Sequence, residues 1–317
     1  MADERVDYIY KNYRIVETKN IHEGKGYSQK ELKEALKQLV NLNFDFMVVE
    51  NEVYQDYNDI KASNKKESTL DLSGSASLLI VDSNLNLSIK NSNNNNIIIV
   101  LLGSSNLSCM AELAHNASIT LVDLSSSSSN SLHISSSSSL IFNILSFSKS
   151  SKIRAMLNAF ANSSIKLNTA FLMDNSTIDS EVLAYNKDRN SSISIHSNAA
   201  LFNSSRCLLK SYAELEKGAK DSRSDIIHRC IVLNEKAHAD SIPVMSVKDK
   251  DAYAAHSSSI IPFDSEFSFY ANTRGIDSNE AKKIEAQGLM ELVSRSINDD
   301  YKSIIEHLIE EKLKMIK

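Results

Sequence analysis

The sequence predicts a mainly β protein built as a β-solenoid, with helical segments before and after it. Three observations support this fold class. Between residues 66 and 261, short apolar stretches of three to six residues recur, separated by clusters of Ser, Asn and Asp. Several of them alternate apolar and polar residues, as in 85–89 and 192–196, which is typical of half-buried strands. Residues 262–317 instead carry apolar residues at helical spacing.

Residues 1–65 form a charged N-terminal segment of mixed character. A Ser-x-x-Glu capping box begins at Ser28, and apolar residues at helical spacing follow it, so we expect a helix over 29–42. The apolar residues 44–49 are expected to form the first strand. Residues 51–68 are polar and rich in lysine, which favours a linker or mobile loop.

The middle zone, residues 66–261, is the expected solenoid core. Related four-residue phrases recur there at uneven spacing and begin at Asn116, Asn162, Asn175 and Asn190. Stacked turns place like residues above one another, and Ser and Asn suit tight corners and side-chain ladders. The alternative is a disordered low-complexity insert, above all over 125–139. Ile, Leu and Val interrupt the serine runs throughout, which favours the solenoid.

The last zone, residues 262–317, is predicted to be helical. Asp277 and Glu280 form a capping-box pattern, and two amphipathic stretches follow it. A helical pair after a solenoid most often caps the open end of the solenoid. It can also serve as a docking element for a partner protein.

Composition excludes several classes of protein. The net charge of −5 and the pI near 5.9 argue against a broad nucleic-acid footprint. Three widely spaced cysteines form no disulfide framework and suit a reducing compartment. The first residues lack the pattern of a secretory signal, and the longest apolar run, 97–102, is too short to span a membrane. We therefore expect a cytoplasmic protein that binds neither nucleic acid nor membrane.

A set of widely spaced motifs occupies the last third of the chain. A proline is followed 13 residues later by a histidine, and after another 13 residues by an FY…RGI motif. The matching residues are Pro243, His256, Phe269, Tyr270, Arg274, Gly275, Ile276, Ala281 and Gly288. Leu289 stands where the pattern has phenylalanine. Over residues 206–297 this order and spacing resemble the SufB/SufD family, the scaffold subunits of SUF-type iron–sulfur cluster assembly.

The resemblance implies a right-handed parallel β-helix and a subunit without enzyme activity of its own. It implies two partners: an ABC-type ATPase (SufC in the family), and a second scaffold that is either a second copy (a homodimer) or a sister SufB/SufD chain. It implies a transient iron–sulfur cluster and, by analogy, a flavin. The length suits the short, archaeal-type members of the family. The implied ATPase-docking residues are Phe269, Tyr270, Arg274, Gly275, Ile276, Ala281, Ile284, Gly288 and Leu289.

The candidate cluster ligands are His228, Cys230 and His256. In SufB the cluster-building cysteine lies 28 residues before the histidine; here that position is His228, and Cys230 follows two residues later. Residues i and i+2 of a strand share a face, so this imidazole and this thiolate suit iron. We expect His228 and His256 of opposite subunits, with Cys230 nearby, to hold a nascent cluster. The alternatives are a buried structural role for Cys230, as for Cys109 and Cys207, and a surface position for His228.

Two other functions compete with this interpretation. One is a binding or structural β-solenoid without cluster chemistry, such as an adhesin or polysaccharide binder. The other is a β-helix carbohydrate enzyme, which needs paired carboxylates, whereas the solenoid has few charged residues before Glu181. The sequence has no GxxxxGK[ST] phosphate loop, so we expect the chain not to bind ATP.

Overall fold

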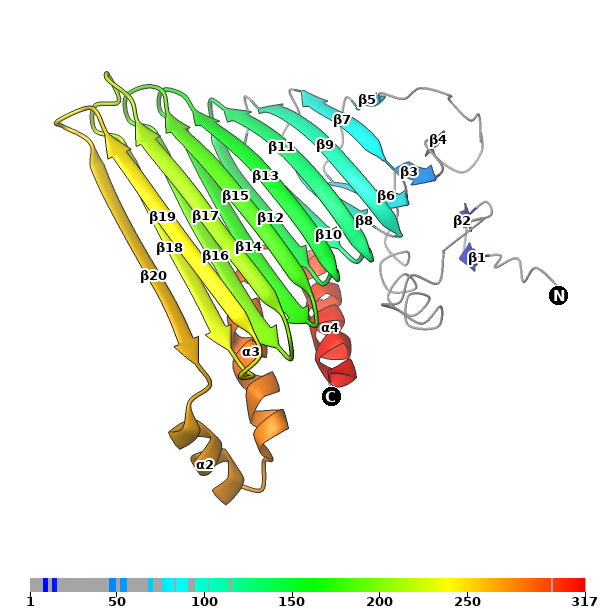
Figure 1. Cartoon of the computed structure of the whole chain (residues 1–317). Helices are drawn as coiled ribbons and strands as arrows, with labels where there is room; N and C mark the ends of the chain where they lie inside the picture. Colours follow the sequence, from blue (N-terminus) through cyan, green and yellow to red (C-terminus); the bar gives the residue numbers. More distant parts are fainter. Residues whose placement is uncertain are drawn as a thin grey trace.

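Two facing parallel sheets wind into a solenoid in the computed structural model (Figure 1). The structure describes residues 8–10, 13–15, 46–49, 52–55, 68–70, 76–82, 84–90, 95–101, 103–113, 116–297 and 299–316. The helix expected over 29–42 lies outside these residues. The mainly β, parallel-solenoid fold class is confirmed.

Consecutive strands of the solenoid alternate between the two sheets. The first sheet runs β20 (Tyr253–Pro262), β18 (Arg223–Val232), β16 (Ser192–Phe202), β14 (Ser164–Asp174), β12 (Ser139–Ser146), β10 (Ala117–Asp123), β8 (Asn95–Leu101), β6 (Ala76–Asp82), β3 (Phe46–Val49), β4 (Glu52–Gln55). The second runs β19 (His238–Val247), β17 (Arg206–Leu215), β15 (Thr177–Asn186), β13 (Ser150–Ala159), β11 (Ser127–Ser136), β9 (Ser104–Leu113), β7 (Leu85–Lys90), β5 (Ser68–Leu70). Pairing is parallel except between β3 and β4, and β1 (Tyr8–Tyr10) pairs antiparallel with β2 (Tyr13–Ile15).

Strand lengths and positions correct three expectations. The strands from β13 to β19 have ten or eleven residues, longer than the expected three to six. β11 lies within the serine run 125–139, so the disordered alternative is wrong there. β4 lies within 51–68, where a linker was expected, whereas β3 confirms the strand expected at 44–49.

Alternating burial explains why a serine-rich sequence forms these strands. In β9 every second residue is buried and the residues between are exposed, and β11 follows the same rhythm. The inward residues fill the space between the sheets (the lumen), and the largest of them include Phe142 and Phe171. The serines of β11 complete strands whose hydrogen bonds come from neighbours on both sides, β9 and β13.

Asparagines occupy corners where the chain passes between the sheets. The backbone φ is positive at Asn162, Asn175, Asn190, Asn203 and Asp221. Asn and Asp enter this left-handed region more easily than other non-glycine residues, which explains the repeated Asn-led phrases. Asn190 Nδ2 donates to Asn162 Oδ1 at 3.2 Å, so a side-chain ladder links the corners of successive turns.

The turns lengthen along the chain, so the solenoid widens toward its C-terminal end (Figure 1). The hydroxyls of Ser104 and Ser126, which are stacked on adjacent turns, are 22 residues apart. Near the C-terminal end, the stacked hydroxyls of Ser191 and Ser222 are 31 residues apart. The strands lengthen accordingly, from 6 residues in β7 to 11 in β16.

Three helices follow β20 among the described residues: α2 (Ser265–Thr273), α3 (Ser278–Ser294) and α4 (Asp299–Met315). α3 and α4 pack along the outer face of the first sheet, where they share an apolar cluster with residues such as Val122 and Leu145. Ser296, between the two helices, donates to Asn143 Oδ1 of β12 at 2.7 Å. The expectation that the helices cap the open end is therefore wrong, because their apolar faces match the outward residues of the sheet.

Candidate functional site

The last turn of the solenoid, β19 and β20, is exposed. All but one residue of β20 is exposed, and in β19 the strict alternation of burial is lost after Ala239. Apolar side chains lie open there: Ile242, Val244, Val247, Tyr253, Ile260 and Ile261. Exposed apolar surface of this kind marks an interaction site more often than a free surface. We call this surface the open end.

His256 lies at the open end on β20. It pairs in register with Ile226 of β18, a residue that faces the lumen. Because strand neighbours in register share a face, His256 points toward the lumen side of the last turn. Its side chain is exposed and accessible to a partner or to iron.

His228 lies one turn deeper, on β18, and is fully buried, so the surface position considered as an alternative is wrong. Its Nε2 lies 2.8 Å from Ser211 Oγ and its Nδ1 lies 2.8 Å from Ser241 Oγ. Burial lowers the pKa of His228 to about 4, so the imidazole is neutral at neutral pH. Ser258 on β20 donates to Ser241 at 2.6 Å, and the resulting hydrogen-bonded chain runs from the lumen to the open end.

Cys230 shares the inward face of β18 with His228 and is fully buried. Its thiol hydrogen-bonds with that of Cys207 on β17, and this bond, together with burial, raises the pKa of Cys207. Burial alone raises the pKa of Cys109 to about 12. The sequence analysis missed the contact between Cys207 and Cys230, because recognising it requires knowing the length of this turn.

One copy of the chain keeps the three candidate ligands apart. His228 pairs with Ser258, two residues along β20 from His256, and Cys230 pairs with Ile260, four residues away. Strand geometry then separates the Cα atom of His256 from that of His228 by about 8 Å and from that of Cys230 by about 14 Å. The part of the chain that the structure describes contains no group of three or more His, Cys, Asp or Glu side chains placed to hold a metal ion.

The residues expected to dock an ATPase divide into exposed and buried groups. Phe269 and Tyr270 of α2 are 72% and 57% exposed, and the Arg274 guanidinium stacks over the Tyr270 ring. Gly275, with φ +79°, ends the turn after α2, and Ile276 is half-buried. On α3, Ile284 and Gly288 are exposed. Ala281 and Leu289 are buried, so they support the helix rather than offer a surface.

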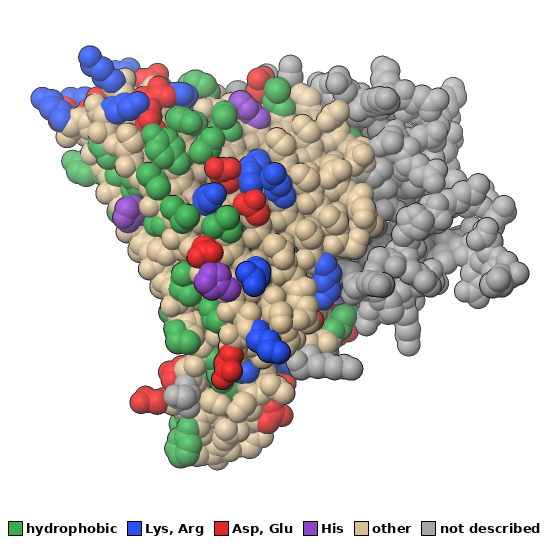
Figure 2. All heavy atoms as spheres, viewed as in Figure 1, with side chains coloured by type: hydrophobic (Ala, Val, Ile, Leu, Met, Phe, Trp, Pro, Cys, Tyr) green, Lys and Arg blue, Asp and Glu red, His purple; other side chains and the backbone are tan. Residues whose placement is uncertain are grey.

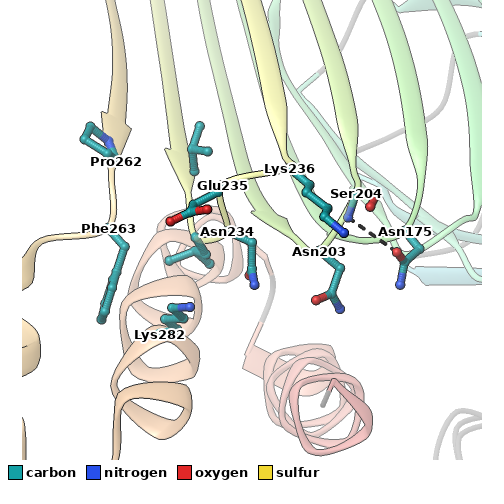
Figure 3. A pocket seen from close by; sticks show the side chains of 11 residues that line it. Asn175, Asn203, Ser204, Asn234, Glu235, Lys236, Pro262, Phe263 and Lys282 are labelled. Atoms are coloured by element: carbon teal, nitrogen blue, oxygen red, sulfur yellow. Dashed lines mark hydrogen bonds between the residues drawn. The ribbon is translucent and has the colours of Figure 1, made fainter.

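A groove of about 900 Å³ lies beside these helices (Figure 3). Corner residues of the solenoid, among them Glu235 and Lys236, form one wall, and Phe263 and Lys282 form the other. The Lys282 ammonium lies 5.5 Å from the centre of the Phe263 ring. The groove therefore joins the corners of the solenoid to the helical segment.

The outer face of the second sheet carries charges of both signs close together (Figure 2). Arg154 pairs with Asp179 at 2.6 Å and with Glu181 at 3.1 Å. The hydrogen bond from Arg154 lowers the pKa of Asp179. A glycosidase acid needs a raised pKa, so these carboxylates form an ion-pair network and not an acid/base pair.

The fold and this site define a parallel β-solenoid with an exposed last turn and helices packed on one sheet. Residues 78–289 match the family described as SUF system FeS cluster assembly, SufBD core domain. The chain therefore belongs to the SufBD family of iron–sulfur cluster assembly proteins.

Curated relatives are similar at low identity. The chain is 25% identical over 111 residues to the iron–sulfur cluster assembly protein SufD of Bacillus subtilis. It is 24% identical over 143 residues to a SufBD family protein of Staphylococcus epidermidis, and 22% identical over 121 residues to one of Mycobacterium tuberculosis. The three matches cover 33%, 45% and 38% of this chain but 25%, 31% and 14% of the relatives. The matched region is therefore a minor part of each relative.

These comparisons confirm the family expected from the motifs around His256 and Arg274. Archaeal-type membership, the flavin, the ATPase and the homodimer stay predictions. Among the described residues, no helix is long and apolar enough to cross a membrane.

Proposed function

We propose that the chain is a scaffold subunit on which iron–sulfur clusters are assembled, working with a SufC-like ABC-type ATPase and without catalytic activity of its own. The observation that carries the proposal is the apolar, exposed last turn in a chain of the SufBD family. Iron and sulfide are the substrates of this assembly, and the cluster is its cargo.

In this proposal two scaffolds meet at their open ends. Ile260 and Ile261 of β20 become buried there, and the edge groups of β19 and β20 gain partners. His256 of each copy then faces the other scaffold across the interface. A second copy is the simplest partner, because one self-complementary surface serves both subunits; a sister SufB/SufD chain is the alternative.

The ATPase binds α2 and the exposed part of α3, with Phe269 and Tyr270 as anchors. Large aromatic side chains exposed on a protruding helix are typical centres of protein interfaces. Movement of the ATPase pulls on α2, which follows β20 after two residues. The pull loosens the last turn and brings the buried His228 and Cys230 to the iron and sulfide.

Reconstitution with iron and sulfide tests the assembly proposal. We expect the visible absorbance of the loaded wild type to be lost in the double variant Cys230→Ser, His256→Ala. His238→Ala is the matched control, because this exposed histidine lies in the same turn but on the outer face of β19. Unchanged absorbance in the double variant contradicts the ligand assignment. A wild type that takes up no cluster, alone or with the ATPase, favours a binding or structural solenoid.

Co-purification with the ATPase tests the docking surface. We expect Phe269→Ala with Tyr270→Ala to weaken ATPase binding at least tenfold, the size typical of an aromatic anchor. Phe160→Ala removes an aromatic ring of intermediate exposure from a corner of the solenoid and serves as the control. Equal ATPase binding by the wild type and the double variant contradicts the assignment of α2.

A further inference from the structure

Two cysteines meet inside the lumen next to the open end. Cys207 lies near the start of β17 and Cys230 near the end of β18, on strands that face each other across the lumen. Both side chains are buried, at 2% and 0% exposure, and the two thiols are hydrogen-bonded. The other cysteine, Cys109, is buried several turns away on β9.

The surroundings of the pair leave room for the sulfur atoms to turn toward each other. Cys207 stacks on Ala239 of the next turn, and Cys230 stacks on Ala199 of the previous one. Alanine is the smallest side chain with a Cβ atom, so rotation of either thiol meets little resistance on these sides.

The position next to the open end gives the pair a route to solvent. Cys230 is covered on the outer side by β20, where Ile260 pairs with it in register and is 45% exposed. Separation of β20 from β18 therefore exposes Cys230 without unfolding the earlier turns, because each turn of a solenoid contacts only its neighbours. Cys109 has no such route, since turns of the solenoid stack on both sides of β9.

We propose that Cys207 and Cys230 form a reversible disulfide when a peroxide reaches the last turn, and that this modification withdraws the Cys230 thiol from metal binding. One sulfur attacks the peroxide, whose O–O bond breaks to give a sulfenic acid and one molecule of water. The second sulfur attacks the sulfenic sulfur, forms the S–S bond and releases a second water. The pair loses two electrons and two protons, and a thiol reductant restores both thiols.

The disulfide staples β17 to β18 across the lumen, one turn below the open end. A partner seated on the open end holds β20 in place and so slows the oxidation. The inference uses the cluster-ligand candidate Cys230, but the formation of the disulfide depends neither on a cluster nor on the ATPase.

The test is a count of free thiols in the full chain after treatment with hydrogen peroxide. The treated protein is unfolded and alkylated, and the mass of each cysteine peptide is measured. We expect three alkylated cysteines before treatment and one after it, Cys109, with recovery of all three after addition of dithiothreitol. The variant Cys109→Ser should pass from two alkylated cysteines to none, whereas Cys207→Ser should form no internal disulfide.

Three alkylated cysteines after treatment would overturn the proposal, as would a disulfide that involves Cys109 or joins two chains. The wild-type measurement alone decides, so a variant that fails to fold does not affect the outcome. The thiol count is independent of cluster uptake. A disulfide without cluster uptake therefore supports this inference while contradicting the proposed function, and the reverse result separates the two as clearly.

Discussion

The middle of the solenoid and its last turn differ in burial although both have the composition of strands. From β9 to β17 inward residues are buried in strict alternation, whereas β20 is exposed almost throughout. The difference is the number of neighbouring turns, two in the middle and one at the end. Burial in this fold comes from the adjacent turns, so apolar residues of the last turn, such as Ile260, depend on a partner to be covered.

The strongest test of this comparison removes a large side chain from the middle. Phe142 of β12 is fully buried, so Phe142→Ala should lower the free energy of unfolding by about 3–5 kcal/mol. Ile260→Ala at the open end should cost less than about 1 kcal/mol in the isolated chain, because no cavity forms there. Denaturant unfolding measures both values, and similar losses for the two variants would contradict the comparison.

A smaller effect is expected from the buried histidine that links the two regions. An unfolded histidine binds a proton below about pH 6.5, whereas folded His228 does so only near 4. Protons therefore favour the unfolded chain in this window, and stability should fall by roughly 2–3 kcal/mol as the pH falls from 7 to about 4.5. Unfolding at several pH values measures the slope. In His228→Gln the slope should flatten, and an unchanged slope would assign the pH dependence to other groups.

The interior also contains a buried carboxylate, and its loss should be felt more than that of an exposed one. Asp123 accepts hydrogen bonds from the backbone N–H of Ser125 and from the hydroxyls of Ser125, Ser128, Ser146 and Ser151. Asp123→Asn replaces one acceptor by a donor and should cost about 1–3 kcal/mol. Asp240→Asn, on the exposed β19, should change stability by less than about 0.5 kcal/mol. Thermal melting compares them, and equal shifts would contradict the prediction.

The smallest effect on unfolding, with the clearest effect on assembly, is expected at the open end. Ile260→Ser should leave the stability of the isolated chain within about 0.5 kcal/mol of the wild type. It should shift the protein from dimer to monomer if two copies bury this residue. Light scattering over a concentration series measures the shift. A wild type that is monomeric at every concentration would direct attention to a sister scaffold.

The fold class was predictable because alternation of apolar and polar residues reports directly on strands, as in residues 85–89. Strand length was not, because the serines of β11 are strand residues only by virtue of the turns on either side. The placement of α3 and α4 also escaped prediction. Their apolar faces suit either an end or a side of the solenoid, and the outward apolar residues of the first sheet, such as Leu145, decide for the side.

The site was predictable in part, for a similar reason. Motif spacing brought attention to His256, and the structure places it on the exposed last turn. The burial of His228 depends on Ser211 and Ser241, which lie on two other strands and approach it only through the winding of the chain. The inward face that it shares with Cys230 did follow from the two-residue period of a strand.

The lengthening of the turns, from 22 to 31 residues, makes the molecule a wedge with a narrow and a broad end. Its two ends therefore differ in outline, and stacking head to tail would set a broad face against a narrow one. Contact between two broad faces instead gives a closed, spindle-shaped particle, widest at its middle. The taper thus selects against filaments, a hazard of any solenoid with an uncovered edge, through geometry rather than through charge.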